Sequence, residues 1–141
     1  MKTFRKIADL VMFSLTDKTG EDAICIIRKV SAREAEIIKA VTGKETAGYV
    51  HIIDRSSVVH TIKKHGNEEK ERSRGQIAVS IADFELAEEI IKGENLIHDG
   101  YTKDGKPLFL YSRRIGSIYY YSEEVRTQRG KLCLKTIFKR K

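Results

Sequence analysis

The spacing of hydrophobic positions changes near residue 94 of the chain. Before this point, apolar side chains recur at helical spacing in residues 31–43 and 80–92, and a third helix is predicted between Asp54 and Gly66. Beyond it, apolar and polar residues alternate with the two-residue period of strands. Helices followed by strands predict an α+β domain with two layers.

Capping residues mark the starts and ends of the predicted helices. Ser31 and Glu34 have the spacing of a capping box, and Gly43 follows the last periodic residue of that helix. Asp54 and Ser56 are both candidate caps for the next helix. These are local signals, because each depends on residues only a few positions apart.

The second half of the chain predicts a four-stranded antiparallel sheet, with the N-terminal helices packed on it. Short turns separate four alternating segments: NLIHDGY, LFLYSRR, SIYYYSEEVR and KLCLKTIFK. Two earlier segments, KTFRKIADLVMFSL and EDAICIIRKV, are apolar enough for strands or buried helices, and their periodicity leaves both open. Residues 66–76 carry charge without periodicity and predict an exposed loop that could act as a lid.

Length and charge narrow the class of protein. The 141 residues fit one domain, and 27 Lys and Arg against 20 Asp and Glu give a net charge of +7, which favours a polyanionic partner such as nucleic acid. No apolar run is long enough to cross a membrane, so no membrane partner is predicted and a cytoplasmic location is expected. Cys25 and Cys133 lie among apolar neighbours and are predicted to be buried thiols.

The stretch VVHTIKKHG, residues 58–66, places His60 and His65 on one predicted helix. Their spacing separates them by about 140° around the axis, so they are not expected to share a metal ion. His65 ends an apolar stripe with Val58 and Ile62, where it either transfers protons near neutral pH or closes the core. His60 points away from this stripe and is expected at the surface.

The connection between the last two strands decides which polar residues share a sheet face. An even number of loop residues places Glu124 and Arg126 on one face with Lys135 and Tyr120, whereas an odd number or a β-bulge places Arg126 with Thr136. The sequence leaves both registers open. The charged face either binds a ligand or is a solvated face that discourages edge-to-edge pairing.

Several segments together resemble a known family. VSAREAEIIKAVTG, HIIDRSSVVHTIKKHG, RGQIAVSIADFELAEEIIKG, SEEVR and KLCLKTIFK are similar to the phage-type barnase, EndoU, colicin and RelE-like nuclease domains. The features that carry the resemblance are the KHG helix end, the helix that contains Asp83, and a closing strand with Thr136 before an aromatic residue. The similarity covers residues 30–141 and leaves residues 1–29 as an unmatched N-terminal extension of a single nuclease-like domain.

The resemblance implies a ribonuclease fold that needs no metal or other cofactor. Helices would cover one face of the four-stranded sheet, with the active site on or beside the other face. The catalytic candidates carried over from the family are His65, Arg126, Thr136, Lys135 and His60. His65 would transfer protons and Arg126 would hold phosphate oxygens, so these two residues are expected to meet across a groove that admits a sugar–phosphate strand.

Three further residues are candidates for binding the substrate. Glu124 becomes a second acid or base if the even register is correct, Arg74 could reach an RNA backbone from the charged loop, and Tyr120 could stack on a base. The predicted function is an endoribonuclease in which the RNA 2′-hydroxyl attacks and leaves a 2′,3′-cyclic phosphate. Its partners would be RNA and an inhibitor (immunity) protein, in a toxin of a phage or mobile element. The alternative is a non-catalytic nucleic-acid-binding or phage-associated interaction module with the same fold.

Overall fold

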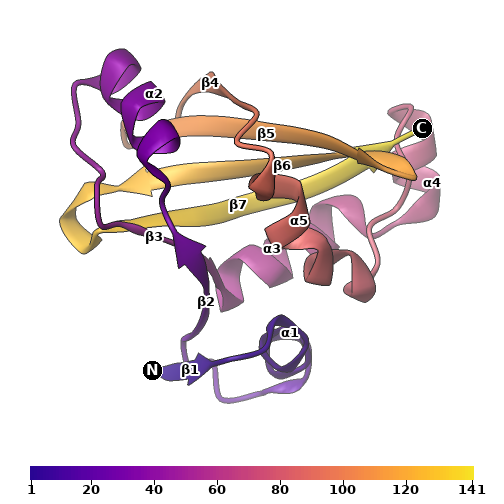
Figure 1. Cartoon of the computed structure of the whole chain (residues 1–141). Helices are drawn as coiled ribbons and strands as arrows, with labels where there is room; N and C mark the ends of the chain where they lie inside the picture. Colours follow the sequence, from indigo (N-terminus) through magenta and orange to yellow (C-terminus); the bar gives the residue numbers. More distant parts are fainter.

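The computed structural model describes all 141 residues, which build one seven-stranded sheet and the helices around it (Figure 1). The strands are β1 (Lys2–Phe4), β2 (Ala23–Lys29), β3 (Val50–Asp54), β4 (Leu96–Tyr101), β5 (Pro107–Ile115), β6 (Ser117–Arg126) and β7 (Lys131–Arg140). Their order in the sheet is β1-β2-β3-β7-β6-β5-β4. The α+β class is confirmed.

The sheet is larger and more mixed than predicted. The four predicted strands are β4 to β7, and each pairs antiparallel with the next. The prediction of a four-stranded antiparallel sheet is nevertheless wrong for the sheet as a whole, because β3 adds to β7 in parallel and β2 and β1 follow it. These three strands come from residues 1–29, which supply β1 and β2, and from the short run VHIID, which was not predicted to be a strand.

The helices divide between one face of the sheet and its margins. They are α1 (Ile7–Thr16), α2 (Ala32–Thr42), α3 (Arg55–His65), α4 (Glu68–Ser73) and α5 (Ala87–Lys92), with 3-10 turns η1 (Ile81–Leu86) and η2 (Thr127–Arg129). In Figure 1, α2 and α5 lie on the near side of the sheet. The capping box of Ser31 and Glu34 is present, and Asp54 is the cap of α3.

Two predicted segments differ from the structure. Residues 66–76 were expected to be an exposed loop, but α4 forms there because Asn67 caps it and the carboxylate of Glu71 is buried. The predicted helix at residues 80–92 is divided into η1 and α5, although the Ser80–Asp83 capping box is present. Short polar helices lack the apolar periodicity on which the prediction relied.

Helix α3 packs along the edge of β7 beyond the point where the pairing of β7 with β3 ends. Pairing between β3 and β7 ends at Ile52 and Cys133, after which the chain turns into α3. The backbone N–H of Ile137 in β7 donates to Thr61 Oγ1 of α3 at 3.4 Å, and Val58 of the same helix enters the main core. At this position the Thr61 side chain takes the place of a neighbouring strand as the hydrogen-bond partner of β7, so this part of the β7 edge is not left unpaired.

The register of the β6–β7 hairpin changes along its length. Near the turn, Glu124 pairs with Cys133, as an even loop predicts. A β-bulge follows at Lys135, and beyond it Ser122 pairs with Thr136. Each of the two alternatives left open by the sequence therefore applies to one half of the hairpin, and Arg126 shares its face with Thr136.

The bulge also decides which residues reach the core. Val125, Leu132 and Leu134 face the helices as the even register predicts, but beyond the bulge it is Ile137, and not Phe138, that does so. We call the opposite side, which carries Ser122, Glu124, Arg126 and Thr136, the open face. Its buried apolar residues form only a small separate cluster of Ile24, Ile52 and Cys133. Cys25 and Cys133 are free and buried, which confirms that prediction.

Candidate functional site

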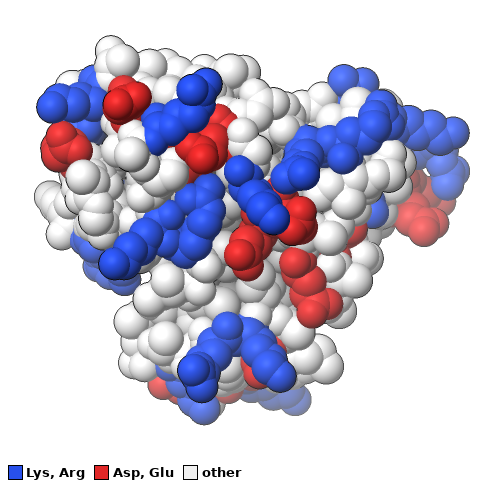
Figure 2. Space-filling model, viewed as in Figure 1, with Lys and Arg blue, Asp and Glu red and all other residues white.

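Basic side chains cover more of the helix-covered side of the molecule than acidic ones (Figure 2). Basic and acidic side chains occur there in several separate groups (Figure 2). The open face differs, because charged side chains of β6 and β7 meet there with the turn between β4 and β5. The bulge of β7 and the N-terminus of α3 both lie at this face.

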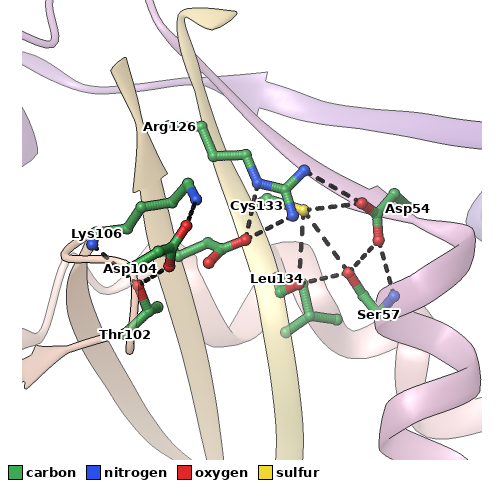
Figure 3. Close-up of polar contacts among 9 residues, drawn as sticks. Asp54, Ser57, Thr102, Asp104, Lys106, Arg126, Cys133 and Leu134 are labelled. Atoms are coloured by element: carbon green, nitrogen blue, oxygen red, sulfur yellow. Dashed lines mark hydrogen bonds and ion pairs between the residues drawn. The ribbon is translucent and has the colours of Figure 1, made fainter. Parts of the chain in front are cut away.

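Arg126 at the end of β6 is held between two carboxylates (Figure 3). Its Nε and Nη2 donate to Glu124 Oε1 at 2.8 and 2.5 Å, and its Nη1 donates to Asp54 Oδ2 at 3.3 Å. A guanidinium has five N–H donors, so two remain for a ligand. Glu124 Oε2 has no protein partner among the hydrogen bonds and is available as a proton acceptor.

Asp54 is itself fixed in place. As the cap of α3, its Oδ1 accepts from the backbone N–H of Ser57 at 2.8 Å, and the Ser57 hydroxyl lies 2.5 Å from the same oxygen and close to the carbonyl of Leu134. The thiol of Cys133 lies 3.4 Å from Asp54 Oδ2 (Figure 3). The cap of α3 therefore orients Arg126, a connection between residues 72 positions apart in sequence.

The β-bulge directs Lys135 toward Glu124. Both residues line a hollow of about 560 Å³, which we call the face hollow, together with Tyr101, Thr102, Lys103, Asp104, Lys106 and Leu108. Bulges commonly redirect a side chain beside an active site, and here the bulged residue is the lysine. A carboxylate and an ammonium group thus face one solvent-accessible space.

A second hollow of about 410 Å³, the rim hollow, adjoins the first at the β4–β5 turn. Its charged lining consists of Lys44, Lys106, Arg126, Arg129 and a single carboxylate, Asp104. Lys106 forms an ion pair with Asp104, whose other oxygen accepts from the hydroxyl of Thr102 (Figure 3). The excess of positive charge suits a phosphate group.

His60 lies on the side of α3 that is turned toward the open face. Val58 enters the core, Thr61 contacts the edge of β7, and His60 lies about 160° from Val58 around the helix. Partial burial and the positive charges of Lys64 and Lys135 lower the pKa of His60 below its usual value. The prediction that His60 is exposed is confirmed. The charge that acts on His60 from Lys135 relates it to the face hollow, because Lys135 lines that hollow.

His65 and Arg126 do not meet across a groove, so that expectation is wrong. His65 ends α3 with 5% of its surface exposed, its Nδ1 lies 3.0 Å from Glu71 Oε2, and its ring stacks on Phe138. Arg126 contacts Asp54 at the other end of the same helix, which rises by about 16 Å. The apolar stripe of α3 carries His65 inward, and the predicted alternative that it closes the core describes this placement.

The remaining candidates lie on β6, on β7 and at the end of α4. The Thr136 hydroxyl is buried without a hydrogen-bond partner, and Tyr120 stacks on Phe138 at 4.8 Å and accepts from Arg140. Arg74 ends α4, where its Nη1 donates to Glu71 Oε1 at 2.7 Å and to the carbonyl of Lys64. Arg74 is therefore more fixed than a loop arginine.

A buried ionic network on the helix-covered face was not predicted from the sequence. His51 donates from Nδ1 to Glu123 Oε2 at 2.6 Å and from Nε2 to Glu34 Oε1 at 3.0 Å, and all three side chains are fully buried. Arg28 and Tyr111 complete the bonds to Glu34. Although burial lowers it, the two carboxylates raise the pKa of His51 to about 9. The histidine is therefore charged at neutral pH.

No group of three or more His, Cys, Asp and Glu side chains is arranged to hold a metal ion. No helix is both long and apolar enough to span a membrane. The cationic and carboxylate side chains of the open face suit an anionic substrate with exchangeable protons.

An α+β fold whose uncovered sheet face carries a carboxylate, a guanidinium and lysines suits a protein that acts on a polyanion. The chain belongs to the phage-Barnase-EndoU-ColicinE5/D-RelE like nuclease3 family, whose match extends over residues 28–141. The predicted resemblance is confirmed and begins within β2, two residues earlier than expected. Comparison with curated proteins and with solved structures found no match.

Proposed function

We propose that the chain is an endoribonuclease that needs no metal ion and acts on the open face of its sheet. The observation that carries this proposal is the position of Glu124, which bonds to Arg126 and lines the face hollow together with Lys135. RNA supplies its own nucleophile, the 2′-hydroxyl, so the protein has to align it, move two protons and stabilise the charge of the pentacoordinate phosphorus.

Glu124 Oε2 takes the proton from the 2′-hydroxyl as the bond from that oxygen to phosphorus forms. The bond from phosphorus to the 5′-oxygen then breaks, and the imidazolium of His60 gives its proton to this leaving oxygen. The products are a 2′,3′-cyclic phosphate and a 5′-hydroxyl. Each proton transfer by a positioned group typically contributes about 10²- to 10⁴-fold in rate.

The cations stabilise the charge that develops on the phosphoryl oxygens. Arg126 keeps two N–H donors for these oxygens while Glu124 and Asp54 hold its orientation. Lys135 adds a point charge from the bulge, whereas the buried Thr136 hydroxyl faces none of the hollows and stays out of this contact. Lys106, which is paired with Asp104, lines the same hollow.

End-group analysis of cleaved RNA tests the proposal. Labelled RNA is incubated with the protein in excess EDTA, and we expect 2′,3′-cyclic phosphate and 5′-hydroxyl ends that Glu124→Gln almost abolishes. Glu88→Gln, which changes an exposed carboxylate of α5, is the matched control and should cleave like the unchanged protein. Intact RNA with the unchanged protein would refute the proposal.

A second candidate function is a nucleic-acid-binding module without turnover. The cationic lining of the rim hollow favours it equally, because binding of phosphate needs charge but no proton transfer. Retention of RNA on the protein without new ends would establish this function in place of catalysis. Both candidates require nucleic acid as the partner.

We further propose that the protein acts as a toxin of a phage or mobile element. A ribonuclease of this kind endangers the RNA of the cell that makes it, so we propose an inhibitor (immunity) protein with an acidic surface that covers the rim hollow. We also propose that residues 1–141 form a single domain, because β1 and β2 pair into the common sheet. The proposed location is the cytoplasm.

A further inference from the structure

A third hollow lies beside the proposed active site and is lined entirely by basic residues. This helix hollow, of about 400 Å³, lies between α3 and α4, and its lining residues are His60, Lys63, Lys64, Lys70 and Arg74. No acidic side chain lines it. We propose that its far end, at Lys64, Lys70 and Arg74, binds the phosphodiester backbone of the RNA strand several nucleotides away from the bond that is cleaved, whereas His60 at its near end serves the proposed active site. This inference rests on the proposed function.

The first argument is the fixed position of Arg74 at this hollow. Glu71, which is fully buried, accepts from Arg74 through Oε1 and contacts His65 Nδ1 through Oε2. Arg74 also donates to the carbonyl of Lys64 at 3.0 Å. These bonds hold the guanidinium at the junction of the two helices, and a preoriented cation loses less conformational freedom when an anion binds.

The second argument is the repulsion among the cations. Besides partial burial, the charges of Lys64, Lys135 and Lys63 lower the pKa of His60, so like charges are held close together without a carboxylate in the lining. Such a site gains free energy when a phosphate group enters and neutralises it. A merely solvated helix surface would be expected to contain acidic partners as well.

The third argument is the continuity with the active site. His60 lines the helix hollow and lies near Lys135, which lines the face hollow. Arg126 meets α3 at Asp54, and Lys64 follows ten residues later on the helix, which corresponds to a rise of about 15 Å. This length equals roughly four nucleotides of a stacked strand. A dinucleotide bound at the face hollow is therefore too short to reach Lys64 and Lys70 at the far end of the helix hollow.

Binding of RNA with methylated 2′-hydroxyls tests the inference without any need for cleavage. The variant Lys64→Gln/Lys70→Gln removes two exposed charges of the helix hollow but leaves Arg74 and its bonds to Glu71 in place. We expect the Kd for an oligomer of about twelve nucleotides to rise roughly tenfold near physiological salt, and the Kd for a dinucleotide to rise far less. The dependence of log Kd on log salt concentration should become shallower by about 1.4.

The matched control is Lys18→Gln/Lys29→Gln, which removes the same charge from exposed positions outside the three hollows. Equal affinities of the two double variants for the long oligomer would overturn the inference. An equal loss for the dinucleotide and the long oligomer would also overturn it. Failure of the proposed function shows separately, as intact RNA in the cleavage assay with the unchanged protein.

Discussion

Glu123 and Glu124 are neighbours on β6, yet their side chains lie on opposite faces of the sheet and in opposite environments. Glu123 is fully buried beside His51, whereas Glu124 binds Arg126 on the open face. The alternation of a strand produces this division. One carboxylate therefore serves the core of the fold and the next is available for chemistry, and the two should respond differently to the same substitution.

Glu124→Gln should lower kcat by about 10²- to 10⁴-fold with little change in the free energy of unfolding. The amide oxygen can still accept from Arg126, but the side chain can no longer take a proton. Cleavage rates and thermal unfolding of the same preparation measure the two effects. A variant that unfolds at a much lower temperature would instead assign Glu124 a structural role.

Glu123→Gln should act on stability and not directly on the chemistry. The substitution removes one of the two charges that face the buried His51 imidazolium, and breaking a buried ion pair typically costs about 3–5 kcal/mol. Chemical denaturation should show this loss. An unchanged unfolding midpoint would contradict the inferred charge of His51.

The stability of the protein should fall as pH rises from about 6.5 to about 9. The neighbouring carboxylates raise the pKa of folded His51 from 6.5 to about 9, so its contribution is complete below pH 6.5 and is lost as the pH increases through 9. Unfolding free energies measured across this interval test the sign. In His51→Gln the slope over the same interval should become flatter, because the titrating group is absent.

His60→Gln should change the pH profile of cleavage as well as its rate. As the proposed acid, His60 is active when protonated, and its pKa lies below the usual 6.5, so kcat/KM should decrease with rising pH through a value under 6.5. The variant should lose this alkaline limb and about 10²-fold or more in rate. The same limb in variant and unchanged protein would assign the acid to another residue.

His65→Gln should reduce stability more than activity. His65 packs on Phe138 and bonds to the buried carboxylate of Glu71, so we expect a loss of about 2 kcal/mol in unfolding free energy. The rate of cleavage per folded molecule should remain within about twofold, since His65 lines none of the three hollows. A loss of turnover in a stably folded variant would restore the catalytic role that the family resemblance suggested for His65.

Features that depend on near neighbours could be inferred from the amino-acid sequence alone. Ser31 and Glu34 close their capping box across three positions, Asp54 caps α3, and the four alternating segments become β4 to β7. Hydrogen bonds and side-chain periods of this kind are set within one element, so they can be inferred without knowing what the element packs against. The strand period placed Arg126 and Lys135 in the last hairpin, and the family resemblance made them catalytic candidates.

The tertiary structure alone decided how the site is assembled. The bulge at Lys135, the pairing of β3 with β7 and the contact of Arg126 with Asp54 join parts of the chain that are far apart in sequence. The network of His51 and Glu123 links residues 72 positions apart. Such contacts depend on which elements lie side by side, and no local pattern encodes this, because the free energy that selects them comes from packing the whole sheet against its helices.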